Sequence, residues 1–227
     1  MRRFPRAARW RFDGWIAGIG TSCGARLILG HWPRSSFGPF SDVMLEQADG
    51  HRLLLAPTRR TADFIAVTYS FDEVRIAPVR VHVSGDDWTV TASPLLDLRF
   101  TAGRRGPVGL LLRAVPGALA AQPFWTAVTD PAARLLLGVR THGTAGGGRY
   151  EWYGARDLHP ITAATAVLGE QDAGSLAAVE PPVRFGFGST PRRLCLVRVT
   201  TTVSTSHIPE LSSSPSPRES RAHEGDL

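Results

Sequence analysis

The chain has 227 residues, of which 43% are apolar, and its formal net charge of +6 rests on 26 basic residues that are all arginine. Such a composition is typical of a globular domain that buries a hydrophobic core. Because the sequence contains no lysine, it excludes a Schiff-base amine, a lysine general base and a P-loop lysine. The arginines are scattered along loops instead of forming a basic helix, so we expect no nucleic-acid partner.

The two cysteines, Cys23 and Cys195, form neither a CxxC pair nor a thiolate cluster. This spacing predicts no metal site, and no motif indicates a cofactor. No apolar run is long enough to span a bilayer, and the residues behind the N-terminal arginines are too short and too polar for an export signal. We therefore expect a cytoplasmic protein, and the sequence favours no particular oligomeric state.

Elements expected in the first half of the chain are mainly strands. Residues 1–13 are expected to be a frayed basic arm that precedes a single domain at 14–203. A helix capped by Thr58 or Thr61 and running to Tyr69 interrupts the strands. Apolar and polar residues alternate, between turn residues such as Asp49-Gly50, in strands expected at 14–19, 25–32, 40–47, 51–56, 79–83, 88–92 and 95–101.

The second half begins with a change from strand-like to helix-like sequence. Prolines interrupt a helical insert expected at 107–137, with helical pieces at 108–115, 124–129 and 132–137. Strands are then expected at 139–142, 149–153, 161–168, 183–187 and 194–203. In the last of these, one face is expected to carry Cys195, Val197, Val199, Thr201 and Val203, which makes Cys195 a core-facing thiol. Residues 204–227 are rich in serine, proline and charge, so we expect a disordered tail. The pattern predicts an α+β fold, mostly an antiparallel curled sheet or barrel with a short helical insert.

The segment from His142 to Ile161 holds the densest group of reactive residue types. Asp157 and His159 are two residues apart, which places both on one face of a strand, where the carboxylate could orient the imidazole for acid–base catalysis. The alternative is structural: the pair would stabilise a turn, while Arg149 and Glu151 pair on a solvated face. Three glycines at 146–148 fit a hairpin loop better than a phosphate loop, because a strand follows them.

Two further segments could contribute to a site. His31 and Asp42 could converge across neighbouring strands as acid and base, although a single histidine at a strand end is more often structural. Asp42 and Glu46 share a strand face but are too far apart for the carboxyl pair of a glycosidase. In the segment 183–193, Phe185 marks a buried face, and its neighbouring glycines would allow a ligand to approach the backbone.

The chain also resembles two groups of known proteins. From RFDGWIAGIGTSCGARLILGHWPRSSFGPFSDVMLE to PPVRFGFGSTPRR, it resembles a family of proteins from high-GC actinobacteria, and this resemblance implies no activity. The stretch from Ser36 to Asp42 is similar to the glycine-aromatic-acid strand of acetoacetate decarboxylase-like proteins, which are β barrels with a ligand cavity. That similarity implies a cavity-bearing β fold with Asp42 at the position of the family's acid. The family's lysine is missing, so it also implies different chemistry or none.

Together these observations predict a domain that binds a small anionic or apolar molecule in a partly apolar, arginine-assisted cavity. Expected ligand contacts are Arg149, Glu151, Arg156, Phe40, Trp152 and Phe185. One alternative is a cofactor-independent enzyme whose acid and base come from Asp157, His159, His31 and Asp42. Another is a protein-interaction scaffold.

Overall fold

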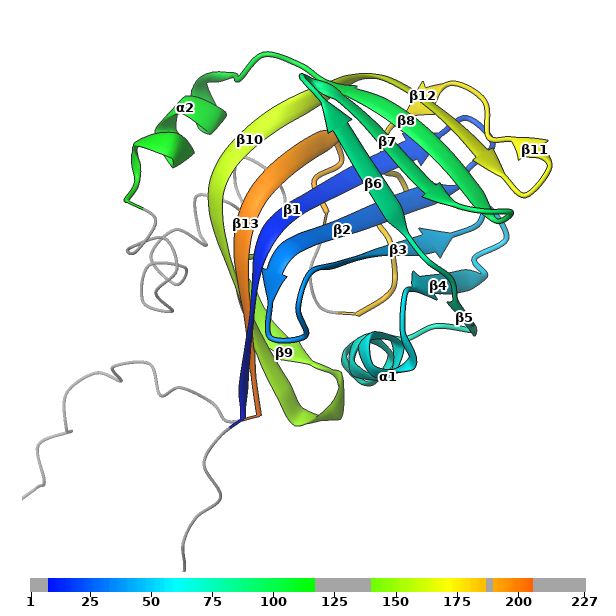
Figure 1. Ribbon diagram of the computed structural model, residues 1–227. Helices are drawn as coiled ribbons and strands as arrows, with labels where there is room; N and C mark the ends of the chain where they lie inside the picture. Colours follow the sequence, from blue (N-terminus) through cyan, green and yellow to red (C-terminus); the bar gives the residue numbers. More distant parts are fainter. Residues whose placement is uncertain (1–7, 117–139, 187–189, 206–227) are drawn as a thin grey trace, which may run out of the picture.

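The computed structural model describes residues 8–116, 140–186 and 190–205. In these residues the chain forms a curled, largely antiparallel sheet beside two short α-helices, which confirms the expected fold class (Figure 1). The helices are α1 (Arg59–Thr68) and α2 (Pro107–Ala114). The strands are β1 (Arg9–Thr21), β2 (Arg26–Ser35), β3 (Phe40–Glu46), β4 (Arg52–Ala56), β5 (Glu73–Ile76), β6 (Arg80–Ser84), β7 (Asp87–Ala92), β8 (Leu96–Ala102), β9 (His142–Ala145), β10 (Arg149–Leu168), β11 (Gln171–Asp172), β12 (Leu176–Ala177) and β13 (Cys195–Ser204).

Strand β10 is the element that curls the sheet. The strand order is β5-β4-β3-β2-β1-β13-β10-β8-β7-β6. The first half of β10 pairs with β13 and its second half pairs with β8, with register shifts at Ala155/Asp157 and Ile161/Ala163. Extra residues of this kind bend a strand and increase its twist. The bent strand brings β6, β7 and β8 over β1, β2 and β3 (Figure 1).

The main hydrophobic core fills the space between these two halves of the sheet. Strand β2 supplies the buried Leu27 and Leu29, and β3 supplies the buried Val43 and Leu45. Trp88 of β7 belongs to the same cluster. Because successive side chains of a strand point to opposite faces, the residues between these core positions project from the other side of the sheet.

Several local expectations are confirmed. Strands β3 and β4 form the expected hairpin, and Gly50 in its turn has a φ of 91°, a conformation that favours glycine. Thr58 caps α1 through its side chain. Helix α1 connects β4 to β5, which pair in parallel. The hairpin that joins β9 to β10 contains the three glycines at 146–148, as expected.

Other expectations need correction. Strand β1 begins at Arg9, so residues 9–13 belong to the sheet and not to a frayed arm, because they pair with β13 along their whole length. Ser204 is buried at the end of β13, so the sheet extends past the expected tail boundary. Residues 183–186 form no strand. Helix α2 matches the first helical piece, while the pieces at 124–129 and 132–137 lie outside the described residues.

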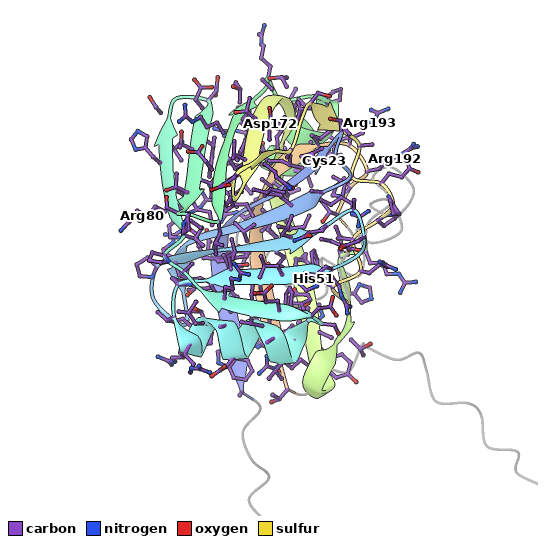
Figure 2. All side chains as sticks on the ribbon, turned by 90° about the vertical axis from the view of Figure 1, so that its right-hand side faces the viewer. Cys23, His51, Arg80, Asp172, Arg192 and Arg193 are labelled. Atoms are coloured by element: carbon purple, nitrogen blue, oxygen red, sulfur yellow. The ribbon has the colours of Figure 1, made fainter. Side chains whose placement is uncertain are left out.

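Three of the arginines, Arg80, Arg192 and Arg193, show that the basic residues do not gather on one side of the molecule. Figure 2 shows Arg80 on one side of the molecule and Arg192 and Arg193 on the other. None of the described helices is both long and apolar enough to cross a membrane.

Candidate functional site

A cavity of about 290 Å³ lies on the face of the sheet opposite the main core. Its walls come from β1, β2, β3, β10 and β13, from the helices α1 and α2, and from Val183, Phe185, Thr190 and Pro191. Its volume is close to the lower end of the range for small-molecule sites, about 300–1,000 Å³. The fold therefore leaves a ligand-sized space between the sheet and its helices.

The cavity wall is largely apolar because the sheet strands place alternate side chains there. Strand β13 supplies Cys195, Val197, Val199, Thr201 and Val203, the five residues expected to share one face. Burial raises the pKa of the Cys195 thiol to about 12, which keeps it protonated and unreactive. The expectation of a buried thiol is confirmed, although Cys195 faces the cavity and not the main core.

Glu151 is the first of two buried carboxyl groups in this wall. The hydroxyl groups of Tyr69 and Tyr153 each donate to the Glu151 carboxyl group at 3.0 Å, and the two hydroxyl oxygens are 2.6 Å apart. Burial raises the pKa of Glu151 to about 7, and the tyrosine hydrogen bonds offset part of this effect. Near neutral pH this carboxyl group exchanges between its acid and its anion, so it can donate or accept a hydrogen bond.

Asp42 is the second buried carboxyl group. Trp32 donates its indole N–H to Asp42 Oδ1 at 3.0 Å, and burial raises the pKa of Asp42 to about 7 despite this bond. Gly30, which pairs with Asp42 across β2 and β3, makes the arrangement possible. A Cβ atom at Gly30 would lie 2.6 Å from both Asp42 Oδ1 and Trp32 Nε1. Any larger residue at this position would separate the carboxyl group from the indole.

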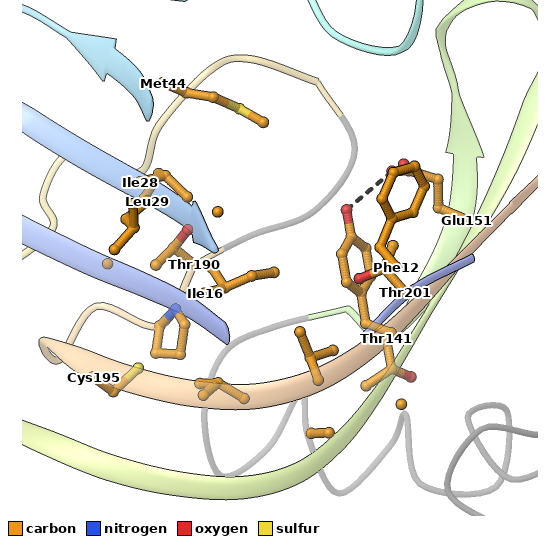
Figure 3. A pocket seen from close by; sticks show the side chains of 18 of the residues that line it. Phe12, Ile16, Ile28, Leu29, Met44, Thr141, Glu151, Thr190, Cys195 and Thr201 are labelled. Atoms are coloured by element: carbon orange, nitrogen blue, oxygen red, sulfur yellow. Dashed lines mark hydrogen bonds between the residues drawn. The ribbon is translucent and has the colours of Figure 1, made fainter. Parts of the chain in front are cut away.

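One end of the cavity is more polar than the rest. Tyr153 pairs directly with Thr201 across β10 and β13, and Thr201 Oγ1 is buried without a hydrogen-bond partner among the described residues. Figure 3 shows Thr201, Thr141 and Glu151 toward one end, and Met44, Ile28 and Cys195 toward the other. An unpaired hydroxyl group in a cavity wall is a ready partner for a polar group of a ligand.

The sequence-derived acid–base candidates do not meet in this cavity. Asp42 lines it, but His31 pairs with Ser41 in the register and points to the opposite face, so the pairing of His31 with Asp42 is wrong. Asp157 and His159 do lie together, with His159 Nε2 3.5 Å from Asp157 Oδ2.

Asp157 and His159 also belong to the opposite face, because the bulge at Ala155/Asp157 reverses which residues of β10 point at the cavity. The Arg105 Nε donates to Asp157 at 2.8 Å, and His159 Nδ1 is 2.9 Å from the carbonyl oxygen of Gly103. These contacts are structural, but the pair lies within β10 and does not stabilise a turn before Pro160.

Of the expected ligand contacts, Glu151 and Phe185 line the cavity. Arg149 instead hydrogen-bonds to the backbone of Phe64 at 2.7 Å and to the Thr68 hydroxyl group. The other three residues lie elsewhere: Phe40 packs against Phe12, Trp152 points away from the cavity beside Tyr150, and Arg156 contacts Asp13.

Sequence reasoning missed Tyr69, Tyr153 and Thr201. Thr201 was expected to share a face with Cys195, and the same two-residue alternation groups Tyr153 with Glu151, but this pattern did not mark Thr201 or Tyr153 as site residues. Tyr69 could not be grouped in this way, because it reaches Glu151 from the end of α1. No group of three or more residues suited to hold a metal ion occurs in the described part of the chain.

Comparison with known proteins finds similarity to solved structures. No family model matches the chain, and no curated protein matches it. An acetoacetate decarboxylase structure from Legionella pneumophila is 9% identical over 89% of this chain and 88% of that chain, with a TM-score of 0.42. A second structure, from structural studies of acetoacetate decarboxylase, is 8% identical over 88% of this chain and 89% of that chain, again with a TM-score of 0.42.

These structures are distantly similar in fold to this protein, a curled β protein with two short helices in its described residues. The resemblance to an actinobacterial family stays a prediction, because no family model supports it.

Proposed function

We propose that the chain binds a small, mostly apolar molecule that carries one carbonyl or hydroxyl group, in the cavity between the sheet and the two helices. The observation that carries the proposal is an apolar cavity with buried polar groups at one end. The apolar body would contact residues such as Ile28 and Met44, and Phe185 would close the wall. The carbonyl or hydroxyl group would meet Glu151 and Thr201.

The chemistry of the polar end favours an uncharged ligand group. A carboxyl group whose pKa is near 7 can donate to a carbonyl oxygen as the acid or accept from a hydroxyl group as the anion. An anionic ligand group would face a partly charged Glu151, although Arg140 also lines the cavity. Arg149 and Arg156, the arginines expected to assist binding, do not line the cavity.

A thermal-shift series with ketones and alcohols of graded size tests this function. A ligand that binds only the folded protein raises its melting temperature. Val197→Phe, which would place a ring inside the cavity, should abolish the shift while the fold remains. The matched control is Val83→Phe on β6, where Val83 is 43% exposed, and this variant should respond like the wild type. A full ligand response from Val197→Phe would reject the cavity as the binding site.

Acid–base chemistry on the bound molecule is the second candidate, since two carboxyl groups with a pKa of about 7 share one cavity. Here Asp42 and Glu151 replace the earlier candidates Asp157, His159 and His31. Asp42→Asn and Glu151→Gln should each keep the thermal shift but stop conversion of the ligand, which nuclear magnetic resonance of the mixture would detect. Equal conversion by both variants and the wild type would leave binding as the function.

A further inference from the structure

An arginine cluster lies on the sheet face opposite the cavity. It consists of Arg34, Arg156 and Arg198, which surround the single carboxylate of Asp13. Arg198 Nη2 lies 2.8 Å from Asp13 Oδ1, Arg34 Nη2 lies 3.3 Å from the same oxygen, and Arg156 Nη1 lies 3.2 Å from Oδ2. Three guanidinium groups thus share one acidic partner.

Each arginine comes from a different strand, so the sheet itself positions the cluster. Arg34 on β2 and Thr200 on β13 pair with Asp13 of β1 from its two sides. Arg156 is the extra residue where the register between β10 and β13 shifts, and the resulting bulge directs it toward Asp13. The cluster is therefore held by paired backbone and not by loops.

The donors of the cluster exceed its acceptors. Each guanidinium group has five N–H donors, whereas a carboxylate accepts about four hydrogen bonds in total. Among the described residues, Asp13 is the carboxylate that forms ion pairs with these three arginines. The Arg198 Nε is buried and has no hydrogen-bond partner among the described residues. The nearby Asp157 is occupied by Arg105 and Arg113.

The cluster carries a net charge of +2, because the three guanidinium groups remain charged and the Asp13 carboxylate is ionised. Burial tends to raise the pKa of Asp13, but hydrogen bonds from Arg198 and Arg34 outweigh it and lower that pKa. The arginines are also reachable from solvent, since their side chains are 72% (Arg34), 31% (Arg156) and 32% (Arg198) exposed. The Arg198 guanidinium stacks over Trp15 at 5.4 Å, which restricts its orientation.

We propose that this arginine cluster binds a doubly charged oxyanion, the phosphate group of a small phosphate monoester. A phosphate dianion balances the charge of +2. It also presents several oxygen acceptors, which planar guanidinium groups bind with paired hydrogen bonds. Backbone-anchored arginines need little reorganisation on binding, which reduces the entropic cost. This site is separate from the cavity of the proposed function and lies on the other face of the sheet.

Isothermal titration calorimetry of the full chain with inorganic phosphate, in a buffer of low ionic strength, tests the site. We expect Arg34→Gln and Arg156→Gln each to weaken binding at least about fivefold, because each removes charge-assisted hydrogen bonds. Arg99→Gln is the matched control: Arg99 is 68% exposed, pairs with Asp97 on β8 and should affect binding little. Asp13→Asn should tighten phosphate binding, because it removes the competing carboxylate.

The opposite results would overturn the proposal. These are no phosphate binding by the wild type, equal weakening by Arg99→Gln and Arg156→Gln, or looser binding by a folded Asp13→Asn variant, with folding checked by circular dichroism. Val197→Phe, which fills the cavity, should bind phosphate like the wild type. Loss of the ketone or alcohol response therefore leaves this proposal standing, and loss of phosphate binding leaves the proposed function standing.

Discussion

Glu151 and Asp42 show how burial decides the charge state of a single residue. Each carboxyl group is almost fully enclosed by apolar side chains, and each has a partner too weak to compensate for lost hydration: two phenols for Glu151 and one indole for Asp42. A guanidinium group in either place would have lowered the pKa, as Arg52 does for Asp72, whose pKa is about 2. The absence of a direct cationic partner at Glu151 and Asp42 among the described residues keeps these carboxyl groups close to the point of ionisation at neutral pH.

The raised pKa of Glu151 predicts a pH dependence of stability. Its ordinary pKa of 4.5 applies to the unfolded chain, and its folded-state pKa is about 7. The stabilising contribution is therefore complete below pH 4.5 and is lost as the pH rises toward 7, because unfolding then releases the buried carboxyl group to ionise in water. The loss is on the order of 3 kcal/mol.

Urea unfolding of the wild type and Glu151→Gln, from about pH 5 to about pH 8, measures this contribution. The free energy of unfolding should fall more steeply with pH in the wild type. Burial lowers the pKa of His31, which acts in the opposite direction, but His31 is present in both proteins and cancels in their difference. Parallel pH profiles would mean that Glu151 does not titrate in this range.

At the scale of elements, Arg149 holds helix α1 against the sheet. Helix α1 has no basic residue in its last turn. Arg149, from the start of β10, supplies that charge by donating to the Phe64 carbonyl oxygen and by stacking 4.4 Å from the Phe64 ring. This role differs from the ligand contact expected from the sequence, where Arg149 was one of several polar residues in a reactive segment.

We therefore expect Arg149→Ala to destabilise the protein by about 1–2 kcal/mol. Amide hydrogen exchange should accelerate in α1 more than in β13, because the helix loses its anchor while the sheet keeps its ladder. Arg99→Ala, at an exposed position of β8, is the control and should change neither quantity appreciably. An Arg149→Ala variant as stable as the control would show that α1 docks through its apolar contacts alone.

The sequence predicted elements better than it predicted the site. Alternation and turn residues identified the β3–β4 hairpin and the face shared by Cys195 and Thr201, because these signals are local. Bulges are not visible in such patterns, and the one beside Arg156 turns Asp157 and His159 away from the cavity. The convergence of Tyr69 with Glu151 joins residues 82 positions apart, so it required the fold.

At the scale of the whole molecule, the curled sheet separates two chemical environments. One face forms the apolar cavity with Glu151, and the other carries the core together with the arginine cluster around Asp13. Strand β10 contributes to both, since Glu151 and Arg156 lie on it five residues apart, about 16 Å of extended chain. A close-packed sheet could either isolate the two faces or couple them through this strand.

We expect the two faces to be isolated, because the described contacts of Glu151 and Arg156 have no residue in common. Substitutions farther apart than about 10 Å usually act independently. The free-energy changes of Glu151→Gln and Arg156→Gln should therefore add to within about 0.5 kcal/mol in the double variant, measured by urea unfolding at one pH. The additivity of Asp42→Asn and Glu151→Gln, measured in the same way, is the comparison, since these two residues line one cavity. A deviation from additivity of more than about 1 kcal/mol in the first pair would contradict isolation and show that β10 transmits strain between the two sites.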